Sequence, residues 1–178
     1  MTFAYDTDVA LRTAAALVNT GSPDEDSLTT TQALQEFFIE WGWTGRHDGS
    51  EAELAAVRAL RGRLRAVWLA AGEEAFVAEV NALLRSGRAL PQLVEHGDYG
   101  WHVHAADSDA SLARRMQVEA AMAFVDVIRA GELSRLRVCA ADDCVHVLVD
   151  LSRNRSKRYC EGGCGNRLAA AAYRSRRG

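Results

Sequence analysis

The sequence predicts a mainly α-helical protein with a little β structure, an α+β chain in which a helical body is followed by a small cysteine-containing unit. Two observations favour this class. Apolar residues recur at helical spacing through most of residues 1–132, and all four cysteines of the 178-residue chain lie within residues 139–164. We therefore divide the chain into a body, residues 1–132, and a C-terminal unit, residues 133–178.

Apolar spacing and capping residues predict five helices in the body. Thr29 with Gln32, and Ser50 with Glu53, have the spacing of capping boxes and indicate where two of these helices begin. The expected helices cover residues 6–18, 29–41, 50–71, 72–87 and 108–129.

The third of these helices carries a row of arginines on its outer face. We interpret the row as a solvated face, paired with neighbouring acids such as Glu51 and Glu53, rather than as a nucleic-acid site. The row consists of Arg58, Arg61, Arg63 and Arg65.

Two short segments, Leu90–Glu95 and Gly100–Ala105, predict a β-hairpin joined by residues 96–99. His102 and His104 would point to the same face of its second strand, since side chains alternate along a strand. Two imidazoles could bind a metal or an acid, but no third ligand is identifiable. We interpret them as histidines at the surface or at the rim of a pocket.

The cysteines have the spacing C-x4-C-x15-C-x3-C. Two pairs separated by a spacer long enough for a β-hairpin suit a tetrahedral site for one structural zinc ion. The ligands would be Cys139, Cys144, Cys160 and Cys164. Two disulfides and a redox dithiol are the alternatives, and His146 is not needed because four thiolates complete the shell.

The disulfide alternative requires an exported protein. Asp6 and Asp8 precede the first apolar run, no basic residue opens the chain, and no stretch approaches the ~18 apolar residues of a membrane span. We therefore expect a cytoplasmic protein without a membrane partner, in which the cysteines stay reduced and bind zinc. The C-terminal unit is then a zinc finger, and we call it the finger below.

Strands at Arg135–Val138 and Val145–Val149 would form the hairpin of the finger, with Leu133–Arg135 as the linker from the body and a helix beginning at Cys164. Charge is divided unevenly between the two parts. Residues 1–132 contain 11 Lys+Arg and 20 Asp+Glu, whereas residues 133–178 contain 10 and 4. The finger is therefore the part expected to face a polyanion.

The segment between the two cysteine pairs, residues 150–158, is basic, and we call it the connector. A basic connector and arginines on one face of the last helix are typical of a protein that binds nucleic acid. If the finger binds nucleic acid, the amide groups at the start of that helix would form an anion site beside Arg167. The predicted contact residues are Arg153, Arg155, Lys157, Arg158, Arg167 and Arg174.

The segments CAADDC, DLSRNRSKRYC and CGNRLAAAAY, residues 139–173, resemble the CGNR zinc-finger family. The LVNT segment at residues 17–20, the GWHVH segment and the RLRVCA junction look like the ABATE domain that precedes this finger. The resemblance implies a stress-induced transcription regulator whose finger binds DNA, with the four cysteines as zinc ligands and Asn166 and Arg167 as its signature pair, so Asn166 joins the predicted nucleic-acid contacts. His146 and Leu148 depart from the aromatic residues expected in relatives, which weakens the idea of a stacking platform.

We therefore expect a DNA-binding transcription regulator, associated with the nucleoid, that binds two half-sites as a homodimer. The body would sense a small-molecule effector or form the dimer. Three alternatives remain: an RNA-binding module, although only Tyr159 and Tyr173 offer stacking rings, a protein-interaction finger, and an enzyme that uses His102, His104 and Asp107. The enzyme is the least expected, because a closed shell of four thiolates leaves no open position for water.

Overall fold

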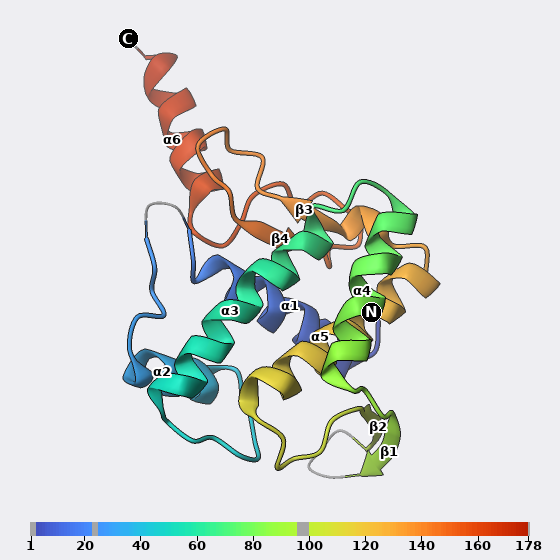
Figure 1. Cartoon of the computed structure of the whole chain (residues 1–178). Helices are drawn as coiled ribbons and strands as arrows, with labels where there is room; N and C mark the ends of the chain where they lie inside the picture. Colours follow the sequence, from blue (N-terminus) through green and yellow to red (C-terminus); the bar gives the residue numbers. More distant parts are fainter. Residues whose placement is uncertain (1–2, 23–24, 96–99, 178) are drawn as a thin grey trace.

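The computed structural model describes residues 3–22, 25–95 and 100–177, and these are mainly helical, as predicted (Figure 1). The helices are α1 (Tyr5–Asn19), α2 (Thr31–Glu40), α3 (Glu51–Trp68), α4 (Glu73–Gly87), α5 (Leu112–Arg129) and α6 (Cys164–Ser175). Two antiparallel sheets pair β1 (Gln92–Glu95) with β2 (Trp101–His104), and β3 (Leu136–Val138) with β4 (Val147–Val149). The predicted turn at residues 96–99 lies outside the described residues. Within the described ranges, no helix combines the length and the apolar character that crossing a bilayer requires.

Side-chain caps fix the starts of two body helices. The hydroxyl oxygen of Ser50 accepts a hydrogen bond from the backbone N–H of Glu53 at 3.2 Å, which confirms this predicted cap. The box predicted at Thr29 is wrong by one residue. Thr30 has the extended backbone of an N-cap, and its hydroxyl oxygen accepts from the N–H of Ala33 at 3.1 Å.

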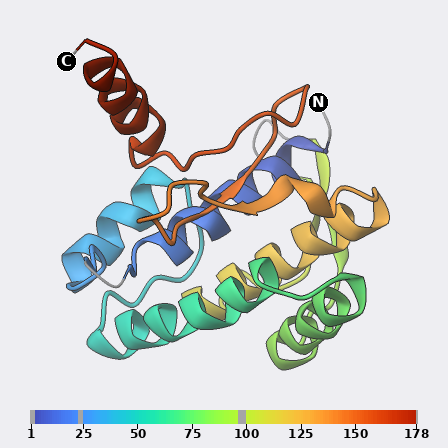
Figure 2. The ribbon, with the colours of Figure 1, turned by 90° about the horizontal axis from the view of Figure 1, so that it is seen from above.

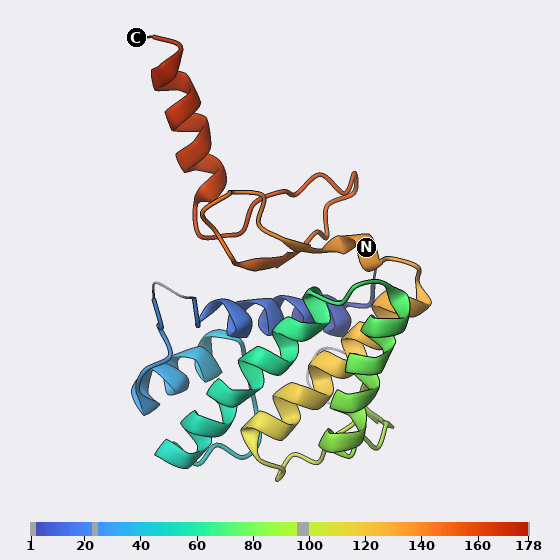
Figure 3. The same ribbon diagram turned by 45° about the horizontal axis from the view of Figure 1, so that its top comes forward.

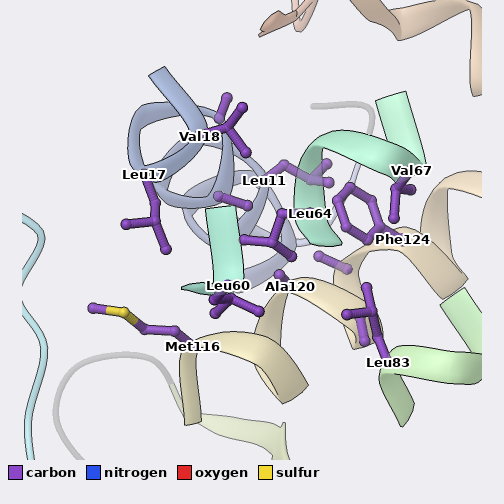
Figure 4. Packing of buried hydrophobic residues seen from close by; sticks show 14 of the residues in the cluster. Leu11, Leu17, Val18, Leu60, Leu64, Val67, Leu83, Met116, Ala120 and Phe124 are labelled. Carbon is purple, nitrogen blue, oxygen red and sulfur yellow. The ribbon is translucent and has the colours of Figure 1, made fainter. Parts of the chain in front are cut away.

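The core of the body forms where α1, α3 and α5 meet (Figure 4). Leu11, Leu64 and Phe124, one from each helix, are fully buried. The ring of Phe124 also meets the Trp68 ring edge-on, at 5.1 Å between centroids. Each large side chain buried in this way contributes about 1.5–3 kcal/mol of transfer free energy. The packing of Leu11, Leu64 and Phe124 therefore holds the three helices together.

The strand β4 joins this core to the finger. Val147 and Val149 point into the same hydrophobic cluster as α1, α3 and α5, whereas Leu148 points the other way and packs with the cysteines. Helix α1 lies between the finger and helices α3 and α5 (Figure 3). The alternation of side chains along one short strand therefore serves two cores.

Polar side chains of the body bind the backbone of β4, and Asn19 does so on the edge that β3 leaves unpaired. The amide nitrogen of Asn19 donates to the carbonyl of Val147 at 2.8 Å, and its amide oxygen accepts from the N–H of Val147 at 2.8 Å. The indole nitrogen of Trp68 donates to the carbonyl of Leu148 at 3.1 Å. Asn19 thus replaces the neighbouring strand that β4 lacks.

The arginines of α3 do not pair with acids of their own helix, so that prediction is wrong. Arg58 and Arg61 instead form ion pairs with Asp26, at 2.9 and 2.8 Å, and Arg65 donates to the carbonyl of Val145 in the finger at 2.6 Å. The loop before α2 and the finger both fold against this face of α3. Tertiary partners therefore replace the local ones.

We predict that Asn19→Ala lowers the free energy of unfolding by about 2 kcal/mol, because it leaves both polar backbone groups of the buried Val147 without partners. Urea denaturation measures this change. Asn81→Ala, on the exposed side of α4, is the matched control and should change the free energy by less than about 0.5 kcal/mol. Equal effects of the two variants would show that the Asn19 bridge does not stabilise the fold.

The stability of the body depends on pH through the carboxylate of Asp26. Its hydrogen bond from Arg61 lowers the pKa of the carboxyl from 3.8 to about 2. The ion pair therefore contributes its full stability above the unfolded pKa, and this contribution disappears as the pH falls from about 4 to about 2. We predict that Asp26→Asn is less stable than the natural protein at pH 6, and that the difference closes by pH 2. Urea denaturation at a series of pH values tests this, with Asn81→Ala on α4 as the control, for which the difference should stay constant because no titratable group is removed.

Candidate metal centre and the basic surface around it

The four cysteines come together at one point of the finger. Their sulfur atoms all lie within 4.8 Å of one another. The sulfur of Cys160 is 3.7 Å from those of Cys144 and Cys164. A tetrahedron with Zn–S bonds of about 2.3 Å has edges of about 3.8 Å, so these separations suit one zinc ion. A disulfide would need about 2.05 Å, and all four cysteines are free.

Two tight turns place the cysteine pairs. The N–H of Cys139 donates to the carbonyl of His146 at 2.8 Å, which extends the β3–β4 hairpin, and the N–H of Cys144 closes a turn on Ala141 at 3.0 Å. Gly163 has a φ of +79°, a conformation that glycine adopts without strain. It allows the chain to reverse so that Cys164 becomes the first residue of α6.

The surroundings of the sulfurs suit a bound cation. Burial raises the pKa of the Cys160 thiol to about 12 and also raises that of Cys144, so without a metal these thiols keep their protons at neutral pH. A divalent ion displaces those protons and holds the four sulfurs as thiolates. The Cys160 N–H donates to the sulfur of Cys139 at 3.4 Å. The cysteines therefore fit one structural zinc in a closed shell.

Arg167 connects the two halves of this centre. Its guanidinium makes a two-bond ion pair with Asp143, in the turn between the first two cysteines, and donates to the sulfur of Cys164 at 3.7 Å. The bonds to Asp143 raise the pKa of Arg167 further above its ordinary range. Asp143 therefore occupies the guanidinium of Arg167, which lies beside the start of α6, where we expected an anion site.

Gly165 lies where α6 passes the ring of Tyr159. A Cβ atom at Gly165 would lie 3.1 Å from a ring carbon of Tyr159, closer than an ordinary van der Waals contact. Tyr159 belongs to the small cluster formed by the cysteines, Leu148 and Leu168. The aromatic residue before Cys160 and the glycine after Cys164 are therefore two sides of one contact.

A buried carboxylate shapes the connector between the cysteine pairs. Asp150 is fully buried and accepts hydrogen bonds from the N–H groups of Ser152 at 3.0 Å and Lys157 at 2.9 Å. Burial acts to raise the pKa of this carboxyl, but these hydrogen bonds and the nearby Arg137 hold it below its ordinary value. Asp150 therefore stays charged and draws both ends of the connector together.

Two arginines hold the same connector by its carbonyl groups. Arg135, only 4% exposed, donates to the carbonyls of Asp150 and Ser152 at 2.7 and 3.0 Å. Arg137 donates to those of Arg155 and Lys157 at 3.0 and 3.2 Å. The segment expected to be a linker is a 3₁₀ turn, Leu133–Arg135, that contributes one of these arginines. Sequence analysis missed this network, and its only signal was the spacing of Asp150 and Ser152, which is typical of an Asx turn.

The predicted nucleic-acid residues fall into two groups. Three of them are held in ion pairs: Arg155 with Glu132 at 2.8 Å, Lys157 with Glu161 at 2.7 Å, and Arg167 with Asp143. The other four are exposed and make no ion pair with any residue that the structure describes. They are Arg153, Arg158, Asn166 and Arg174. Helix α6 projects away from the body (Figures 1 and 2), and Arg174 is exposed in its last turn.

His102 and His104 share a face of β2, as predicted, with their Nε2 atoms 3.1 Å apart. Asp107 does not join both of them. It lines a cavity of about 520 Å³ with His104, whereas His102 lines a different cavity of about 1060 Å³ with His104 and Glu119 but without Asp107. The three residues proposed for an enzyme therefore do not line one pocket together.

We predict that Cys164→Ser, like a chelator, removes the one zinc per chain and unwinds α6, but leaves α1 to α5 folded. The reason is that the body core includes β4 and none of the cysteines. Metal analysis and hydrogen exchange measure the two effects. Ala169→Ser, on the exposed side of α6, is the control and should keep both zinc and helix. Loss of protection throughout α3 and α5 would contradict this division.

Comparison with known families agrees with the geometry. The family model described as "CGNR zinc finger" matches residues 135–177, and the ABATE model matches residues 11–131. The resemblance expected from the sequence is thereby confirmed. No protein with a curated description matches the sequence. The two families are of regulator and zinc-finger types rather than enzyme types. The chain belongs to the ABATE family, described as "Putative stress-induced transcription regulator", and carries a CGNR zinc finger after its ABATE region.

Proposed function

We propose that the protein regulates transcription by binding duplex DNA through the exposed basic surface of its finger. One observation carries this proposal: the finger presents exposed basic residues that make no ion pair with the described residues, and its helix α6 projects away from the body (Figure 3). We define this basic surface by the four exposed residues Arg153, Arg158, Asn166 and Arg174.

Rigidity matters because a basic tail that moves freely binds any polyanion. Here the connector is held from inside by Asp150, Arg135 and Arg137, and α6 is joined to the metal centre through Cys164. The backbone that carries the basic side chains of the connector and of α6 is therefore held in place. Phosphates would be bound by the connector, and the projecting α6 has the form of a helix that enters a groove.

The acidic charge of the body also favours binding of DNA with the finger facing the duplex. Residues 1–132 contain 20 acids against 11 basic residues, so a phosphate backbone is repelled by the body and attracted by the finger. One small finger offers few base contacts, so specific binding requires two copies of the chain on two half-sites. A protein that works in this way is located on the nucleoid.

We predict that the double variant Arg153→Gln/Arg174→Gln keeps its zinc and fold but binds duplex DNA at least tenfold more weakly at low salt. Removing two phosphate contacts should also reduce the slope of log affinity against log salt by about 0.9 for each charge. Fluorescence anisotropy with a labelled duplex, at several salt concentrations, measures both quantities.

The matched control is Arg85→Gln/Arg129→Gln, which removes two exposed arginines from α4 and α5 in the body. It changes the net charge equally and should leave the affinity for DNA nearly unchanged. Equal losses in the two double variants would show that net charge alone governs binding. Preference for single-stranded RNA over the duplex would favour the RNA-binding alternative.

A further inference from the structure

A cavity of about 610 Å³ separates part of the finger from the body. Its walls come from α1 and the end of α2 on one side, and from β4, the connector and residues 161–162 on the other. Small-molecule sites have volumes of roughly 300–1,000 Å³ and often lie between two structural units. The size and position of this cavity therefore suit a small ligand that touches the body and the finger at once.

The interior of the cavity is mostly apolar. Ala15 and Ala16 of α1 form one wall, and Val147 and Leu151 of the finger form the opposite one. Trp41, at the end of α2, adds a large aromatic surface. A flat apolar ligand can replace water against these groups without leaving a polar group unpaired.

Charged residues at the cavity show where an anion fits. Lys157 of the connector binds the carboxylate of Glu161 at 2.7 Å, and both residues line the cavity together with Arg12 of α1. A carboxylate is thus already held by Lys157 at this wall of the cavity. The Glu161 side chain is 86% exposed, so its ion pair is weak and can be exchanged for another.

Arg12 lines the same cavity and makes no ion pair with the residues that the structure describes. The only other acid on the wall is Glu40, which precedes Trp41 at the end of α2. Once Glu161 turns into solvent, two cations therefore face a single carboxylate. This balance favours a ligand with one negative charge over a neutral or positively charged ligand.

We infer that this cavity binds a small aromatic carboxylate, with its ring against Trp41 and its carboxylate between Arg12 and Lys157. The site would be the effector site of the regulator. This consequence rests on the proposed function. A bound carboxylate adds one negative charge beside the basic connector, so it weakens the binding of DNA, and DNA weakens the binding of the ligand by the same factor.

Three indoles that differ only in their side group test the site directly. Isothermal titration of the full-length, zinc-loaded protein with indole-3-acetate, indole-3-ethanol and tryptamine compares a negative, a neutral and a positive group on one ring. We expect indole-3-acetate to bind at least tenfold more tightly than the other two. Absence of indole-3-acetate binding, or equal binding of all three, would overturn the proposal.

Two variants locate the binding. Arg12→Gln should reduce the affinity for indole-3-acetate to that for indole-3-ethanol, and Trp41→Ala should weaken both. Arg85→Gln, an exposed arginine on α4 outside the cavity, is the matched control and should change neither. Zinc content and thermal unfolding confirm that each variant is folded. Unchanged binding in folded Arg12→Gln would also overturn the proposal.

The effect on DNA is a separate measurement. Indole-3-acetate at saturation should weaken duplex binding by the natural protein at least threefold and should not affect Arg12→Gln. Binding of the ligand with no change in DNA affinity would overturn the effector role and support the site alone. A protein that binds no DNA would overturn the proposed function, and the titration would still decide whether the site exists.

Discussion

The strand β4 is the contact on which the whole arrangement depends. Three consecutive residues, Val147, Leu148 and Val149, alternate between the core of the body and the cluster around the cysteines. Asn19 binds both polar groups of the Val147 backbone, so β4 is hydrogen-bonded to α1 as well as to its partner strand β3. The finger is therefore seated on the body at its hairpin and not joined to it by a flexible linker.

The metal centre and the connector extend this order outward from the hairpin. Cys139 follows β3 and Cys144 closes the next turn, so two zinc ligands inherit their position from the body. Cys160 and Cys164 then place α6 relative to the hairpin, and Arg167 ties α6 to Asp143. Between them, the buried charge of Asp150 arranges the basic connector. Body, metal and basic surface thus form one continuous structure.

Much of this could be predicted from the sequence, because the signals are local. The spacing of apolar residues gave the body helices, Ser50 marked the start of α3, and the spacing of the four cysteines indicated the zinc site. The strand predicted at Val145–Val149 also implies opposite faces for Val147 and Leu148, because side chains alternate along a strand, and the structure has them so.

The parts that could not be predicted depend on contacts between distant residues. Arg61 forms its ion pair with Asp26 and not with acids of its own helix, because the loop before α2 folds back beside it. Arg167, expected to face a phosphate, meets Asp143, 24 positions away in the chain. The cavity beside Trp41 exists only once α1, α2 and the finger are packed together. No periodicity or spacing in the sequence encodes such meetings.

The most direct test of this account is to map the DNA-binding surface on the ¹⁵N-labelled, zinc-loaded protein by following amide chemical shifts during titration with a duplex. The account predicts chemical-shift changes in residues 152–158 of the connector and along α6. The amides of α3, α4 and the β1–β2 hairpin should be unaffected. Changes concentrated on the body, with the connector and α6 unchanged, would contradict it.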